Sequence, residues 1–490
     1  MSESIIETIP ESFEMKEGMH VRTRLASRLD SFIFYALLCV IALTAIPFGT
    51  VQPWWEALFE SAIFVLCVLS VVEIMLSGLG DTSRYKLLLP LLALLLFAFL
   101  QTLPLKGQNA SAAGISTAAA RAISADPYET RIFILKVAAI SLTLALLIRY
   151  TKSKRRLSAL MFLIIGVGMA CALFGIIRQT TQHQATGFLI PYLKPDVGYA
   201  QFINKNHFAF LMEMALGLTL GFLVAGGARR DNALMYLSAA APVWIALVLC
   251  GSRGGILSML SQIIFLALSF NLARPQADMY KRTSQNILLR VGRSLALRVL
   301  LITGLVAAIF VGMVWVGGES LVSRLQTVPG EVSQDRTTLG ASRSEIWRAT
   351  WRMIEDHPIA GVGFNGYWMA ITQYHDAPGL LTPQEAHNDY LEILASGGLI
   401  GIAIFIWFLV LFVREVRRAL TTEDAFRRAT IVGACAGIFG VAVHSFVDFG
   451  LHITINSLIF FALIAMATVN VAATKSRMER RSEKRATVAA

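Results

Sequence analysis

Seven polar side chains stand out because each lies near the end of a long apolar segment or within the longest polar one. They are Lys205, His207, Arg253, Arg343, His387, Asp448 and His452. All but Asp448 are bases. Arginine can bind phosphate oxygens with two parallel hydrogen bonds, and an imidazole with an ordinary pKa of about 6.5 can accept a proton near neutral pH. The set is typical of a site for an anionic, membrane-attached substrate such as a lipid pyrophosphate.

Arg253 lies in the segment Gly251-Ser252-Arg253-Gly254-Gly255, which is all that separates two apolar runs. A charged residue at a membrane edge is costly and by default functional. The neighbouring glycines allow a close backbone approach, which favours an anion site. The alternative is an interfacial arginine whose charged end only reaches towards water.

Arg343 belongs to a predicted amphipathic helix. Ser342 and Glu345 form a capping box, and the helix should end near Asp356 because a proline follows at position 358. Trp347, Trp351 and Ile354 share one face at helical spacing, so we expect this helix to lie on the membrane surface with its tryptophans down. The alternative is an ordinary packed helix with ion pairs on its other face.

His387 follows a second capping box, Thr382 to Glu385, with proline at the first helical position. We expect a helix that runs from there straight into the next apolar span and carries His387 in its second turn. The alternative is a histidine with only a structural hydrogen bond. The glycines of residues 361–367, GVGFNGY, predict a tight turn rather than a phosphate-binding loop, since no Lys-Ser follows.

The remaining polar groups lie at two further span ends. Lys205 and His207 open one span, and His444, Asp448 and His452 follow at intervals of four where another span ends. A continuous helix from 444 to 452 would separate the two histidines by about 12 Å, so we expect no metal site there. Asp448 should orient His452 or a nearby arginine.

The amino-acid composition indicates which class of protein carries these polar side chains. The chain has 490 residues, of which 56% are hydrophobic and 15% charged, whereas soluble domains carry about 25% charged residues. This argues against a soluble enzyme, a nucleic-acid binder and a disordered chain. The five cysteines lie within or at the ends of apolar runs, so we expect no disulfide framework.

Twelve apolar runs have the length needed to cross a bilayer as helices. They cover residues 31–49, 55–77, 86–103, 132–149, 157–177, 206–226, 233–250, 254–271, 297–316, 389–413, 429–447 and 453–473. We therefore predict an all-α polytopic membrane protein with about 12 transmembrane helices.

Basic residues predict the orientation of these spans. The net charge is +11, and the basic clusters fall at alternate connections if both termini are cytoplasmic, as the positive-inside rule requires. This gives five segments: a cytoplasmic segment 1–30, spans one to nine within 31–316, a large periplasmic loop 317–388, spans ten to twelve within 389–473, and a basic cytoplasmic tail 474–490.

Five motifs in this chain resemble the O-antigen ligase and Wzy-type polysaccharide polymerase superfamily. They are CGSRGG at 250–255, SRSEIWRATWRMIEDHPIAGVGFNGY at 342–367, AHNDYLEILASGGLIG at 386–401 and, more weakly, FINKNHFAF at 202–210 and HSFVDFGLHI at 444–453. The resemblance implies a GT-C-like fold in the bacterial inner membrane and an undecaprenyl-pyrophosphate-linked glycan as donor on the periplasmic side. It implies no cofactor and no obligatory metal. Acceptors in the family are lipid A-core for ligases and a lipid-linked glycan for polymerases.

The resemblance also implies roles for individual residues. The essential arginines of the family match Arg253 and Arg343, and its histidine matches His387. On the chemistry of glycosyl transfer, the arginines would stabilise the departing pyrophosphate and His387 would act as general base. Residues expected to bind or position substrate are Lys205, His207, Asn388, Asp448 and His452.

Two other classes of function compete with this interpretation. Transporters and flippases also have about twelve helices, but they usually place ionisable groups near the bilayer midplane. Here the span centres are almost free of charge apart from Glu213 and Glu73. A passive scaffold would leave the cations at one face without a role. The sequence does not favour ligase over polymerase.

Overall fold

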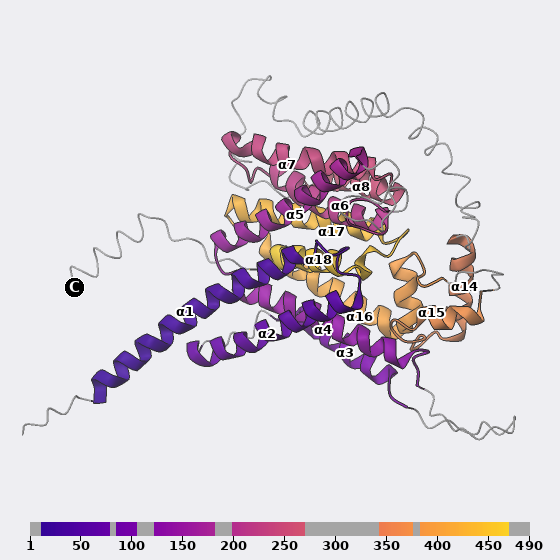
Figure 1. Cartoon of the computed structure of the whole chain (residues 1–490), viewed down its shortest axis with the longest axis horizontal. Helices are drawn as coiled ribbons and strands as arrows, with labels where there is room; N and C mark the ends of the chain where they lie inside the picture. Colours follow the sequence, from indigo (N-terminus) through magenta and orange to yellow (C-terminus); the bar gives the residue numbers. More distant parts are fainter. Residues whose placement is uncertain are drawn as a thin grey trace, which may run out of the picture.

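The computed structural model describes residues 11–78, 85–104, 122–181, 198–269, 343–375 and 383–469. Helices are the regular elements in these ranges (Figure 1). They are α1 (Glu11–Leu43), α2 (Pro53–Ser77), α3 (Leu88–Gln101), α4 (Pro127–Tyr150), α5 (Lys154–Thr181), α6 (Lys205–Val224), α7 (Arg230–Leu249), α8 (Arg253–Ser269), α14 (Arg343–Asp356), α15 (Tyr367–Ala370), η1 (Ile371–Gln373), α16 (Asp389–Ala419), α17 (Ala425–His444), η2 (Gly450–His452) and α18 (Thr454–Thr468).

Eleven of the twelve predicted spans coincide with a helix of the described chain, and the ninth, 297–316, lies outside the described residues. Eight helices are long and apolar enough to cross a membrane, and α3, α8 and α18 are shorter apolar helices. Large apolar side chains such as Met75, Leu96, Ile264 and Leu409 are exposed on the outer helices. Exposed apolar surface on this scale is typical of a face that contacts lipid. The chain is therefore an all-helical polytopic membrane protein within these ranges.

Side-chain caps fix where several helices begin. Asp126 accepts hydrogen bonds from the amides of α4, Asn204 from α6, Asn388 from α16 and Asp424 from α17. An aspartate or asparagine at this position stabilises a helix by about 1 kcal/mol because it satisfies amides that have no partner within the helix.

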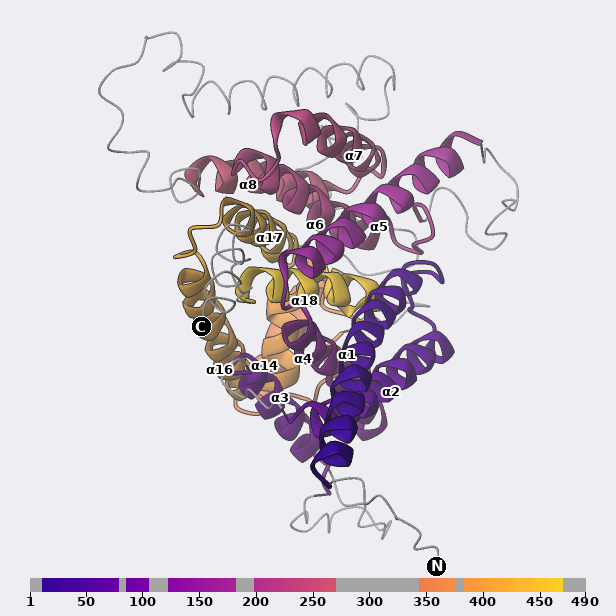
Figure 2. The same cartoon turned by 90° about the vertical axis from the view of Figure 1, so that its left-hand side faces the viewer.

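The centre of the bundle is formed by α6, α17 and α18, with α7 and α8 on one side and α1 to α4 on the other (Figure 2). A side chain at Gly217 or Gly221 of α6 would collide with the backbone of α17 at Gly437 or Gly433. Small residues at such a crossing let two membrane helices pack backbone against backbone. This close contact places the start of α6 beside the end of α17.

The predicted helix at 342–356 is present as α14, and the membrane-facing orientation of its tryptophans stays a prediction. Of the predicted stripe, Trp351 is 51% exposed and Ile354 is buried, and Ile354 joins Ala349 and Met353 of the adjacent stripe in a small core that lies against α16. The two stripes are neighbours on the helix. Ala349 is small enough to permit the close approach to α16, and tryptophan is not.

The glycine-rich segment 361–367 forms the expected turn, and the buried Gln101 at the end of α3 holds it in place. The Gln101 amide donates to the carbonyls of Ala360 (2.7 Å) and Ser396 (3.0 Å) and accepts from the amide of Phe364 (3.2 Å). Thr130 of α4 donates to the Phe364 carbonyl at 2.6 Å. These bonds join α3, α4 and α16 through one turn.

Two features of α16 contradict the predicted continuous helix around His387. Residues 383–388 are not helical, and α16 begins at Asp389 with Asn388 as its cap. The helix is also interrupted at Gly398, whose φ of 59° and ψ of −157° belong to a region open only to glycine. The interruption frees amides of α16 to pair with the 358–363 segment, as in Leu399 N to Pro358 O at 2.8 Å.

We expect Gln101→Leu to lower the thermal unfolding midpoint in detergent by at least about 5 °C. Leucine has a similar size but leaves the Ala360 carbonyl and the Phe364 amide without these partners, at about 1–3 kcal/mol each, and removes one of the two donors to the Ser396 carbonyl. Gln373→Leu is the control because Gln373 is exposed. Equal midpoints for the two variants would contradict the role assigned to Gln101.

Candidate active site

A fully buried carboxylate, Asp448, lies just beyond the end of α17 and contacts three separate segments of the chain. Nη2 of Arg343 lies 3.7 Å from its Oδ2, and Nδ1 of His387 lies 3.5 Å from its Oδ1. The side-chain amide of Asn206 donates a hydrogen bond to Oδ2, and the backbone amide of Phe449 donates to Oδ1 at 2.9 Å. Asp448 therefore brings together two of the three predicted catalytic residues.

The neighbouring bases keep Asp448 ionised. Burial by itself would raise the pKa of this carboxyl, but His387 at its side and the nearby His207 and His444 together lower the pKa below its usual value. The side chains of Arg343 and His387 are 37% and 31% exposed. The Asp448 carboxylate is thus buried beneath a site in which the side chains of Arg343 and His387 remain accessible to solvent.

His387 is held by an unusual backbone conformation at the start of α16. Its φ is +50°, a left-handed conformation that is uncommon for a residue other than glycine. The next residue, Asn388, caps α16 by accepting from the amides of Tyr390 and Leu391. The amide of Asp389 donates to the Ser445 carbonyl at 2.9 Å. His387 is therefore fixed on a turn tied to the end of α17, rather than on a helix.

One aromatic ring, that of Phe449, contacts three of the predicted histidines. The ring centroids of His207 and His387 each lie 4.8 Å from it, and that of His452 lies 5.7 Å away. His207 is buried, and its Nε2 has no hydrogen-bond partner among the described residues. The structure therefore gathers His207, His387, Asp448 and His452 around one position.

Arg253 and Lys205 are the first residues of α8 and α6 and lie at the same end of the bundle. A side chain at Gly254 would collide with the imidazole of His444 and would meet Val447 at 3.1 Å, so glycine lets Arg253 approach the residues before Asp448. Lys205 directly precedes Asn206, which contacts Asp448. Both bases thus stand beside the segment that carries the central carboxylate.

His444 and His452 do not share a continuous helix, which corrects the spacing argument made from the sequence. The helix α17 ends at His444, and His452 lies in the separate short helix η2. His444 is buried, stacks on Phe210 with ring centroids 4.1 Å apart, and its Nδ1 lies 3.1 Å from Oε2 of Glu213. His444 therefore points into the bundle, away from the exposed site.

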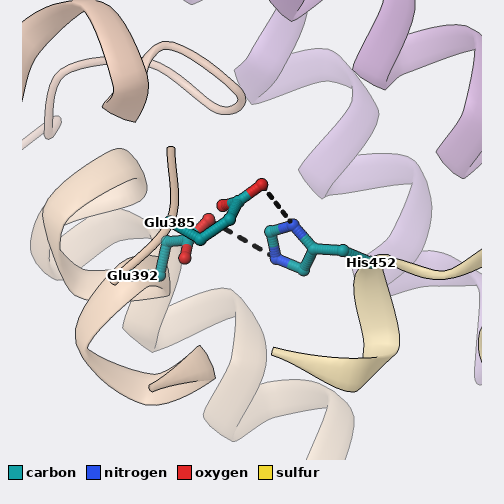
Figure 3. A group of neighbouring side chains, drawn as sticks. All are labelled: Glu385, Glu392 and His452. Atoms are coloured by element: carbon teal, nitrogen blue, oxygen red, sulfur yellow. Dashed lines mark ion pairs between the residues drawn. The ribbon is translucent and has the colours of Figure 1, made fainter. Parts of the chain in front are cut away.

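His452 faces three carboxylates that the sequence did not single out as functional, and Figure 3 shows two of them, those of Glu385 and Glu392. Its Nδ1 is 3.3 Å from Glu385, and its Nε2 is 3.4 Å from Glu392 and 3.8 Å from Asp389. Ligand atoms of Glu385, Glu392 and His452 all lie within 4.8 Å of one another, so these three residues could hold a metal ion. The spacing of the acids, at 385, 389 and 392, is the one signal in the sequence that could have revealed them.

Fold and site together define a multi-helix membrane protein with a cationic site at one end of its bundle. Residues 237–406 match the family model described as O-antigen ligase, Wzy_C. The match confirms the resemblance seen in the sequence motifs. The match includes Arg253, Arg343 and His387. No curated protein matches the chain.

We expect Asp448→Asn to destabilise the protein at pH 7 by at least about 1 kcal/mol, because Arg343 and His387 lose their carboxylate. The pKa of Asp448 is lowered below its ordinary 3.8 in the folded state. Its stabilising contribution is therefore present above that value and is lost as the pH falls towards the folded pKa. Thermal unfolding in detergent should show a constant difference from wild type between about pH 7 and pH 5, and a smaller one below about pH 4.

The matched control for this comparison is Asp231→Asn, because Asp231 is exposed. It should leave the unfolding midpoint close to that of wild type across the same range. A difference for Asp448→Asn that does not change with pH would show that the ionised carboxylate is not the cause.

Proposed function

We propose that this protein is an inner-membrane glycosyltransferase that transfers a glycan from an undecaprenyl-pyrophosphate-linked donor to an acceptor hydroxyl on the periplasmic side. The observation that carries the proposal is the buried Asp448, which holds Arg343 and His387 together at a bundle end. The family match over residues 237–406 supports the reaction class. We infer O-antigen ligase or polysaccharide polymerase activity.

Each group has a defined task in this reaction. The acceptor oxygen forms a bond to the anomeric carbon while the bond from that carbon to the pyrophosphate oxygen breaks, and the electron pair leaves with the pyrophosphate. Nδ1 of His387 faces Asp448 at 3.5 Å, so Nε2 takes the acceptor proton and Asp448 stabilises the resulting imidazolium. The 3.5 Å separation is of the kind that tightens when substrate binds.

The second task is to stabilise the leaving group. Arg253 and Arg343 neutralise the charge that grows on the pyrophosphate, and arginine suits this because it offers paired donors to phosphate oxygens. Lys205 adds a third cation beside them. His207, Asn388 and His452 position the substrates around the Phe449 ring.

The charges at the opposite end of the bundle support a periplasmic site. Arg149 is paired with Glu73 at 2.6 Å, Lys152 with Asp30 at 3.0 Å and Lys154 with Asp424 at 3.6 Å. These bases lie at the ends of helices far from α14, which Figure 1 shows on the other side of the molecule. By the positive-inside rule a basic end is cytoplasmic, so the site would face the periplasm.

A transporter or flippase of lipid-linked glycans is the second candidate, and the buried pair of Glu213 and His444 favours it. An acid and a base inside a helical bundle are common on transport routes. The two functions differ in their product. Transfer yields a new glycosidic bond and free undecaprenyl pyrophosphate, whereas transport leaves the donor intact.

We expect His387→Gln to reduce transfer from a lipid-linked glycan in liposomes by about 10²- to 10⁴-fold, because the general base is lost. Arg343→Lys and Arg253→Lys should each reduce it by roughly 10- to 100-fold, since a charge-assisted bond contributes about 1.5–3 kcal/mol. The rate of formation of the glycan product, separated by gel or mass spectrometry, is the measurement.

His357→Gln and Arg348→Lys are the controls, because both residues are exposed on or just after α14. They should transfer glycan at the wild-type rate. Normal transfer by His387→Gln and Arg253→Lys would disprove the assignment, and movement of intact donor across the bilayer without a product would support the transporter.

A deletion strain separates ligase from polymerase. Full-length glycan chains that remain on the lipid carrier identify a ligase, which passes them to lipid A-core. Single repeats on the carrier identify a polymerase, which passes them to another lipid-linked glycan.

A further inference from the structure

A buried acid–base pair lies inside the bundle, and the transfer reaction described above gives it no task. Glu213 belongs to α6 and His444 ends α17, and their side chains are 0% and 1% exposed. Nδ1 of the imidazole lies 3.1 Å from Oε2 of the acid. An ionisable residue inside a membrane bundle is costly and by default functional, so the pair calls for a role.

The imidazole of His444 is fixed from two sides. One face stacks on the ring of Phe210, with centroids 4.1 Å apart and an angle of 17° between the planes. Nδ1 is bonded to Glu213, whereas Nε2 has no hydrogen-bond partner among the described residues. Within the described structure, Glu213 is therefore the polar group that sets how this ring is turned.

The ring of His444 occupies the space beside the start of α8. A Cβ atom at Gly254 would collide with the imidazole and would lie 3.1 Å from Val447. Gly254 directly follows Arg253, the first residue of α8. The position of the ring therefore determines how closely Arg253 approaches the end of α17.

The backbone of His444 is tied to the segment that carries the central carboxylate. Its carbonyl accepts hydrogen bonds from the amides of Val447 at 2.9 Å and Asp448 at 3.2 Å. Asp448 in turn lies against Arg343 and His387. His444 thus contacts the start of α8 through its ring and the Asp448 segment through its carbonyl.

We propose that His444, oriented by Glu213, is a positioning residue that sets the place of Arg253 relative to Asp448 and His387, a role that rests on the transfer reaction proposed above. Glu213 serves as the hydrogen-bond acceptor for Nδ1. The pair touches no substrate and exchanges no proton during the reaction. A misplacement of about 1 Å at reacting groups costs roughly 100-fold in rate, so a buried pair that fixes this distance affects catalysis strongly.

The first test compares two substitutions of Glu213 in purified full-length protein in liposomes. Glu213→Leu has no acceptor for Nδ1, and we expect it to lower kcat for transfer by about 10- to 100-fold. Glu213→Gln keeps an acceptor oxygen, and we expect its kcat to stay within about threefold of wild type. Equal losses in the two variants would overturn the proposal, because the pair would then act through its charge, as a transport route requires.

The control for Glu213→Leu is Thr219→Val. Thr219 is equally buried in α6, and its hydroxyl donates to the Ala215 carbonyl of the same helix at 2.7 Å. Its loss leaves His444 in place, so this variant should transfer glycan at the wild-type rate. A loss in Thr219→Val equal to that in Glu213→Leu would show a general effect of altering α6 and would contradict the proposal.

Gly254→Ala tests the same contact from the α8 side and decides if Glu213→Leu fails to fold. The new methyl group takes the space of the His444 ring, so we expect a loss of kcat of about 10- to 100-fold. Gly166→Ala is its control, because a side chain at this helical glycine of α5 meets nothing within 4 Å. Wild-type transfer by Gly254→Ala would overturn the proposal.

A double-mutant cycle with Arg253→Lys separates positioning from a general loss of stability. If the ring acts through Arg253, Glu213→Leu should lower kcat much less in the Arg253→Lys background than in wild type, whereas independent effects multiply. Equal factors in both backgrounds would contradict the proposal. His387→Gln is the reference: if it transfers normally, the proposed function itself fails, and if it alone loses transfer, the role of His444 fails.

Discussion

The carboxylate of Asp448 is the constraint on which the rest of the site depends. A charge buried at the end of a helical bundle is stable only when other groups compensate it. Arg343 comes from α14, His387 from the turn before α16, and Asn206 from the first turn of α6. Satisfying one charge therefore fixes the relative positions of three elements that are far apart in the sequence.

Glycine makes these approaches possible. The contact of α6 with α17 relies on glycines in both helices, and Gly254 lets the start of α8 lie against His444. Each contact brings a helix end that carries a base towards Asp448. Close packing of the membrane helices and the clustering of polar groups at one end are thus parts of one arrangement.

The sequence predicted the elements better than their details. Apolar length located eleven helices, and the alternating direction of successive spans placed Lys205, Arg253 and Asp448 at one end. Position 387 was misjudged because two start signals compete there: the Thr382 capping box and Asn388 are both good caps, and the tie of Asp389 to Ser445 favours the second. That tie is a long-range contact, which no local pattern reveals.

The same limit applies to the packing of α14 and to the surroundings of His452. Neighbouring stripes of α14 are both partly apolar, and only the partner helix α16 determines which one is buried. The acids at 385, 389 and 392 resemble a solvated helix start until η2 brings His452 against them. Contacts with distant segments determine which helix face is buried and which group the acids meet. The periodicity within one segment carries no information about those contacts.

The break in α16 at Gly398 has a mechanical consequence. An unbroken rod from Asp389 to Ala419 would carry any tilt of its lipid-facing half directly into the turn beside His387. At the interruption, both halves of α16 are instead tied to one external strap, because Ala395 and Ser396 accept from the amides of Val362 and Gly363, and the amides of Leu399 and Ile400 donate to Pro358 and Ile359. A load on the lipid-facing half is therefore shared with residues 358–363 and, through the bonds of Gln101 to Ala360 and Ser396, with α3.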